Sequence, residues 1–143
     1  MMEWIEPKTD WVESDFFNYY DYNRIRNNLM YLNDKCNIYF PPDFYFKWGK
    51  EKQVGDYVYA KEFNLFEEVL TSINYRAYRY DIGMEKSYFD LGITIDYNEL
   101  NRIEKACLRL YKMFEQIETK SRRVAFRANG TDFEDSGENE WQS

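Results

Sequence analysis

Histidine is absent from this sequence and cysteine is scarce, and no known catalytic spacing joins the carboxylates that are abundant. The 143 residues include no histidine, which removes the commonest general base, metal ligand and pH switch. The two cysteines, Cys36 and Cys107, have no cysteine or histidine partner near them in sequence. Carboxylate pairs such as Glu67 and Glu68 are normal on a solvated helix face and indicate no reaction by themselves. We therefore expect no catalytic residues, no cofactor and no metal site, and we do not expect an enzyme.

The charge and the hydropathy pattern exclude further classes of partner. The formal net charge is −7, whereas proteins that bind a phosphate backbone usually carry a basic face, and anionic lipid is disfavoured for the same reason. No run approaches the length that spans a bilayer, and the first residues do not form a secretory signal. We expect no nucleic acid, membrane or small-molecule substrate as partner, and a protein made and kept inside a cell or assembled there.

The elements that position the remaining residues come from one pattern that occurs three times, in residues 17–25, 58–66 and 95–103, at offsets of 41 and 37. Each copy has a helix N-cap position with an acid three residues later, where a carboxylate can bond back to the cap N–H. An invariant asparagine and an apolar residue follow. The positions are the caps Asn18, Tyr59 and Asp96, the acids Asp21, Glu62 and Glu99, the asparagines Asn23, Asn64 and Asn101, and the apolar residues Ile25, Phe66 and Ile103.

Each copy continues with apolar residues at alternating steps of three and four, which is the stripe of a bundle helix. The pattern predicts helices over about 19–35, 60–79 and 97–121. Such helices are marginal alone, so the stripes are expected to face each other. The predicted fold is mainly α, a three-helix bundle built from a threefold tandem capped-helix repeat, with long aromatic connections and extended termini. The sequence leaves open whether the helices run parallel or up and down.

The repeated asparagines and the two cysteines need separate interpretations. Asparagine is a weak helix former, yet it holds the fifth helical position in every copy. Our hypothesis is that its amide is buried and bonds the backbone leading into its own or a neighbouring helix. The alternative is an exposed asparagine inherited by duplication. Both cysteines fall on the apolar stripes and are interpreted as small core residues.

The composition divides the chain into three parts. Residues 1–16 are expected to form an extended N-terminal arm, which packs on its own bundle or on another subunit. Residues 17–121 form the helical repeat domain. Residues 122–143 are expected to hold a short strand-like segment at 124–127 and an acidic, flexible tail. Aromatic residues make up 20% of the chain, more than three helical stripes can bury, so some are expected to contact partners. The candidates are Trp4, Trp11, Phe133 and Trp141.

The sequence also resembles a segment found in phage structural proteins. Residues 3–11 (EWIEPKTDW) and 15–29 (DFFNYYDYNRIRNNL) are similar to a P-K-T-D-W … N-x-x-D-Y-N-R-I pattern in the tail, baseplate or fibre region of phages and prophages of Gram-positive bacteria. Phe16 stands where tyrosine is usual. Residues 92–104 (GITIDYNELNRIE) are also similar to the family, so the resemblance covers roughly residues 3–127.

The resemblance implies a non-enzymatic virion component, present in several copies or as a homo-oligomer and assembled in the bacterial host cytoplasm. We expect a tail- or baseplate-associated protein that bridges neighbouring virion proteins. Three alternatives stay open: a head or connector component, an attachment protein that binds a host receptor or carbohydrate, and an acidic intracellular inhibitor that mimics DNA. The family pattern identifies no catalytic residue that can be carried over.

Overall fold

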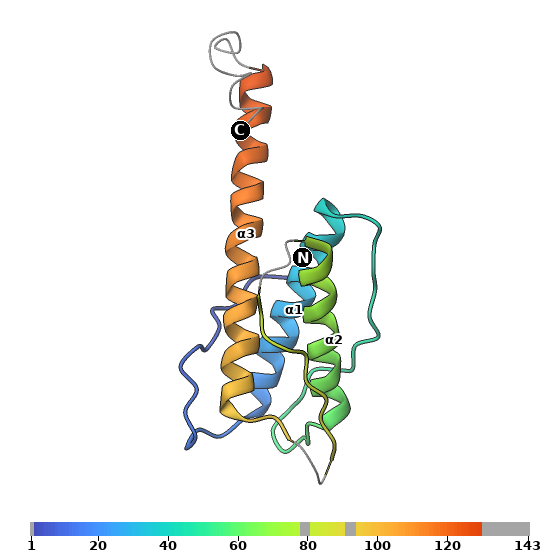
Figure 1. Ribbon diagram of the computed structural model, residues 1–143, viewed down its shortest axis with the longest axis vertical. Coiled ribbons are helices and arrows are strands. Elements are labelled where there is room, and N and C mark those ends of the chain that lie inside the picture. Colours follow the sequence, from blue (N-terminus) through green and yellow to red (C-terminus); the bar gives the residue numbers. More distant parts are fainter. Residues whose placement is uncertain (1, 78–80, 91–93, 130–143) are drawn as a thin grey trace. The chain divides into compact units, whose positions relative to one another are not determined.

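The computed structural model describes residues 2–77, 81–90 and 94–129. In these ranges the chain forms α1 (Tyr19–Tyr39), α2 (Ala60–Ala77) and α3 (Tyr97–Asn129), and no strand (Figure 1). This confirms the mainly α prediction. The chain divides within α3 into two compact units, Met1–Leu110 and Tyr111–Ser143. The repeat and the candidate site lie in the first unit.

All three helices begin where the repeat predicts. In α1 the Asp21 carboxylate accepts the cap N–H of Asn18 at 2.9 Å, and in α2 Glu62 does the same for Tyr59 at 2.9 Å. The weak cap at Tyr59 is therefore compensated by its acid. In α3 the cap Asp96 accepts the N–H of Glu99 at 3.0 Å instead. Each arrangement satisfies one of the N–H groups that a helix start leaves open.

The predicted helix ends were less accurate, and one prediction was wrong. α1 extends four residues beyond the predicted residue 35 and stops at Tyr39, shortly before Pro41 and Pro42, which exclude helix. Residues 122–129, where a strand-like segment was expected at 124–127, are helical in backbone. A helix that has already formed gains one hydrogen bond per added residue, and this gain outweighs the weak β preference of Val124 and Phe126. The predicted acidic tail, 131–143, lies outside the described residues.

Within residues 1–110 the helices run parallel, because α1, α2 and the first part of α3 all begin at the same end (Figure 1). The apolar stripes form the core between them, as predicted. Tyr22 of α1 stacks on Phe66 of α2 with ring centroids 5.2 Å apart. Cys36 and Cys107 are buried free thiols, as expected of core residues. The other core residues of this unit include Ile25, Leu29, Leu32, Phe63, Leu70, Ile73, Leu100, Ile103 and Leu110.

Parallel helices need long return connections, and those before α2 and α3 run back along the bundle as extended segments. A similar extended segment precedes α1, and we call all three segments lead-ins. We define the lead-ins as residues 2–11 before α1, 44–52 before α2 and 81–88 before α3. Asparagines on α1 hold two of these segments through main-chain groups. Asn28 exchanges two hydrogen bonds with Ile5, at 3.0 and 2.8 Å, and Asn37 exchanges two with Phe44, at 3.0 and 3.1 Å. The lead-ins therefore belong to the fold even though they are not helical.

Candidate functional site

The three repeated asparagines make the same contact with a lead-in, which we call the asparagine clasp. In each clasp the side-chain Nδ2–H donates to the carbonyl of one lead-in residue over 2.9–3.0 Å, and Oδ1 accepts the N–H of that same residue over 2.7–2.8 Å. The pairs are Asn23 with Lys52, Asn64 with Tyr88, and Asn101 with Trp11. The hydrogen bonds of our hypothesis are confirmed, although the amides are half-buried and not fully buried.

The clasps connect the repeats in a closed cycle. Asn23 of α1 holds the lead-in of α2, and Asn64 of α2 holds the lead-in of α3. Asn101 of α3 then holds the lead-in of α1, so the last repeat is joined to the first. The three stripes therefore close within one chain, and the core leaves no helical stripe open among residues 2–77, 81–90 and 94–110.

At the junction of α3 with α1, a buried triad reinforces the clasp. Glu104, which is 1% exposed, accepts two hydrogen bonds from the Arg24 guanidinium, both at 2.8 Å, and one from the Trp11 indole at 2.6 Å. Arg24 also pairs with Asp21 at 2.9 Å. Burial opposes the charge on Arg24, but Glu104 and Asp21 outweigh it and raise the pKa of the guanidinium.

The junction of α2 with α3 has an equivalent triad. Glu67 accepts the Tyr88 hydroxyl at 2.6 Å and a guanidinium N–H of Arg102, which also pairs with Glu99 at 2.6 Å. Burial, and then the Glu67 carboxylate, raise the pKa of the Tyr88 phenol. Both triads place an aromatic donor and an arginine on a buried acid. Breaking such a pair on one side is strongly destabilising, so these groups belong to the structure of the fold.

The junction of α1 with α2 departs from this pattern. In the repeat register, Arg26 replaces the buried acid and Leu65 replaces the arginine. The residue that the asparagine clasps is Lys52 here, where the other two junctions have an aromatic donor. The Lys52 ammonium turns to Glu62 at 2.9 Å, and Arg26 donates to the carbonyl of Gly49 at 3.0 Å. No buried triad therefore fills this junction, and its charged groups lie nearer the surface.

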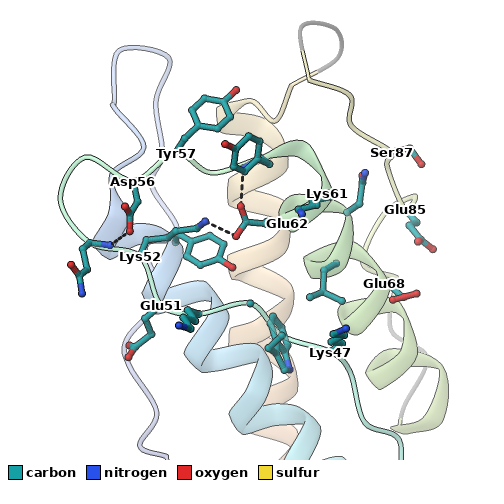
Figure 2. Close-up of a pocket in the computed structure, with 18 residues that line it drawn as sticks. Lys47, Glu51, Lys52, Asp56, Tyr57, Lys61, Glu62, Glu68, Glu85 and Ser87 are labelled. Carbon is teal, nitrogen blue, oxygen red and sulfur yellow. Dashed lines mark hydrogen bonds and ion pairs between the residues drawn. The ribbon is translucent and has the colours of Figure 1, made fainter.

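A broad open hollow of about 1150 Å³ lies beside this irregular junction, along the outer side of α2, and we call it the α2 trough. Figure 2 shows Lys52 and Asp56 on one side, Glu85 and Ser87 on the other, and Lys61 of α2 between them. The two sides are the connections before α2 and before α3. The asparagine clasps of α1 and α2 fix these connections and so determine the walls of the trough.

The lining of the α2 trough combines charged groups of both signs with aromatic rings. It contains four lysines and five carboxylates, a net charge of −1, and neither cysteine. Tyr57 and Tyr59 meet edge to face at 4.6 Å, and Lys52 lies over the rings of Tyr22 and Tyr59 at 5.6 and 5.9 Å. Burial, and then Glu62, raise the pKa of the Tyr22 phenol. The described residues contain no group of three or more acids or cysteines placed to hold a metal ion.

The candidate partner contacts have different outcomes. Trp11 is 3% exposed and buried against its own chain, so it is not an exposed contact in this structure. The reason is the clasp with Asn101 and the indole hydrogen bond to Glu104. Trp4 is half-buried and its ring lies 5.8 Å from that of Tyr31. Phe133 and Trp141 lie outside the described residues.

Sequence reasoning missed the triads although their signal was present. Arg24 and Arg102 lie 78 positions apart, which is the sum of the two repeat offsets, and Glu67 and Glu104 lie 37 apart. Extending the repeat alignment by a few residues would have found them. The clasped residues have no such signal because the asparagines bind main-chain groups, which every residue type carries.

Comparison of the chain with protein-family models, with curated proteins and with solved structures found no match. Among the helices of the described residues, none combines the length and the apolar character needed to cross a membrane.

Proposed function

We propose that this chain is a non-enzymatic structural protein of a phage virion, associated with the tail or baseplate, that bridges neighbouring subunits. The resemblance of residues 3–29 and 92–104 to phage structural proteins supports the class of protein. The same residues supply the clasp of Trp11 by Asn101 and the Arg24–Glu104 pair, which are parts of a scaffold.

The observation that carries the bridging role is a set of exposed apolar side chains at the end where the helices begin, which we call the aromatic rim. All three repeats contribute to it. Phe16 is 84% exposed, and Tyr57 occupies the same position in the second repeat, 41 residues later. Phe89 adjoins this end because its neighbour Asp90 accepts the first N–H of α2, that of Ala60, at 2.8 Å. The rim consists of Phe16, Tyr20, Val54, Tyr57 and Phe89.

Aromatic residues are enriched in protein interfaces, where they supply contact area at low entropic cost. A group of exposed aromatic residues at one end of a small domain therefore favours an interface at that end. The decisive experiment is quantitative mass spectrometry of purified particles from the phage or prophage that encodes the chain. We expect the chain in the particles at a fixed number of copies relative to the tail proteins. Replacing Phe16 and Tyr57 with serine should lower this number, whereas replacing the exposed Tyr45 should not. Absence of the chain from the particles would contradict the proposal.

The α2 trough favours a second candidate function, binding of a neutral host saccharide by an attachment protein. Its near-neutral lining offers both donors and acceptors, and the exposed rings of Tyr57 and Tyr59 offer flat apolar surfaces of the kind that pack on a sugar ring. Titration with maltotetraose and chitotetraose, followed by NMR, would test it. Shifts confined to the trough and lost in Tyr59→Ala but not in Tyr45→Ala would support this function, and no shifts at millimolar saccharide would count against it.

A further inference from the structure

The first lead-in differs from the other two in how the chain holds it. The lead-ins at 44–52 and 81–88 are joined to a helix through the chain at both ends. Residues 2–11 are joined to the helices of the described unit only through residues 12–18. The Asn101 clasp closes the cycle of repeats. It therefore joins α3 to residues 2–11, two segments that lie far apart in sequence.

The groove that receives residues 2–11 recognises mainly the backbone. Asn101 clasps Trp11, Asn28 clasps Ile5, and the Glu104 carboxylate accepts the N–H of Lys8 at 3.1 Å. The main side-chain anchor is the Trp11 indole, which donates to Glu104. All of these acceptors and donors lie on α1 and α3. The same segment from a second copy would meet identical groups in identical geometry.

The link between the segment and α1 is an exposed turn that can open at small cost. The N–H of Val12 donates to the Asp15 carboxylate at 2.9 Å, the N–H of Asp15 donates to the carbonyl of Val12 at 3.0 Å, and Lys8 pairs with Asp15 at 3.5 Å. Hydrogen bonds and ion pairs in contact with water contribute little net stability. When straightened, the five residues 12–16 span roughly 16–18 Å.

This short span determines which surfaces would meet. Residues 12–16 lie at the end where α1 begins, beside the aromatic rim, so a second copy must approach by that end. Exchange keeps every contact between segment and groove and loses only the exposed turn. It adds the burial of two aromatic rims, which a monomer leaves in water. The balance therefore favours exchange when the rims are complementary.

We propose that residues 2–11 are exchanged between two copies of this chain, each segment lying in the α1–α3 groove of the other, so that the two aromatic rims meet in a twofold dimer. The inference names the partner for the bridging role and rests on that proposed function.

The test uses the full chain and two variants with complementary defects. Trp11→Ala removes the side-chain anchor of residues 2–11, so this segment binds any groove more weakly, and it leaves the groove of the variant intact. The double variant Asn28→Ala/Asn101→Ala lowers the affinity of the groove for the segment, because it removes four hydrogen bonds to the segment backbone. It leaves the segment and the Arg24–Glu104 pair intact. Light scattering should give about twice the 17.6 kDa chain mass for the native protein and the single chain mass for each variant alone. A mixture of the two variants should form a one-to-one dimer, because one native segment then meets one native groove.

A second pair of variants keeps the test sharp if the first pair folds poorly. Deleting Glu13 and Ser14 shortens the turn, so the segment cannot fold back onto its own groove, and the dimer fraction should rise. Inserting four Gly/Ser residues there should lower it, since a longer link lets the segment reach its own groove easily. The proposal is overturned if the native protein and the shortened variant are both folded monomers, or if a dimer survives Trp11→Ala unchanged. Particle composition is measured separately, so a monomer here would leave the virion role standing.

Discussion

Replacing Asn101 with alanine isolates the clasp that closes the cycle of repeats. The change removes the two hydrogen bonds to Trp11, at 2.8 and 2.9 Å, and leaves the N–H and C=O of Trp11 without their partner. At about 0.5–1.5 kcal/mol of net stability for each hydrogen bond, the loss is about 1–3 kcal/mol. Alanine is a better helix former than asparagine by roughly 0.5 kcal/mol, which offsets part of this loss. The expected net destabilisation is about 0.5–2.5 kcal/mol, with a central value of about 1.5 kcal/mol.

Urea denaturation followed by circular dichroism measures this difference, and thermal melting should show a decrease of about 3–8 °C. Asn98→Ala is the matched control, because Asn98 is an exposed asparagine in the first turn of the same helix. We expect the control to change stability by less than about 0.5 kcal/mol. Equal stabilities for Asn101→Ala and Asn98→Ala would refute the clasp and favour an asparagine inherited by duplication.

Three further predictions concern stability and reactivity. Gly83→Ala should destabilise the protein by about 2–3 kcal/mol in urea denaturation, because Gly83 has a φ of +82° and an added Cβ would lie 2.6 Å from the Cδ of Arg102. Gly49→Ala is the control and should cost little, since its added Cβ would make only an ordinary contact at 3.8 Å. Equal effects of the two substitutions would refute this account. Burial raises the pKa values of the Cys107 thiol and the Tyr88 phenol in the folded state, so only the unfolded chain ionises just above their ordinary values. Stability should therefore fall as the pH rises from about 9 to 11, by up to about 1.4 kcal/mol per group and pH unit, and a flat urea midpoint over this range would contradict the assignment. Cys107 should resist a thiol reagent at about pH 8 until the protein unfolds, and rapid labelling of the folded protein would show that it is accessible.

The sequence predicts the helices well because their starts and stripes depend on local chemistry. The acids Asp21 and Glu62 bond the cap N–H groups as the repeat requires, and the stripe residues are buried. Helix ends are less predictable, since α3 continues through residues 124–127 by propagation although their side chains favour strands. The parallel arrangement also could not be derived, because it depends on where the connections lie and not on the stripes.

The candidate site was less accessible to sequence reasoning than the fold. Trp11, Lys52 and Tyr88 occupy equivalent clasped positions with three different side chains, so no pattern of residue types marks them. The trough lies beside the junction of α1 with α2, which lacks a buried triad of this kind. This difference becomes visible only when Arg26 and Leu65 are compared with their counterparts in space. The rim residues are exposed because the apolar residues of the three stripes already fill the core.

Native-state hydrogen exchange by NMR tests the cycle of clasps most directly. The backbone N–H groups of Trp11, Lys52 and Tyr88 lie in segments without regular secondary structure, and each donates to an asparagine side chain. We predict that these three amides are protected, with the similar opening free energies expected of one cooperative unit, while the exposed amides of Val54 and Gly55 exchange rapidly. Exchange of all three at the rate of the surrounding exposed residues would contradict the closed cycle of repeats.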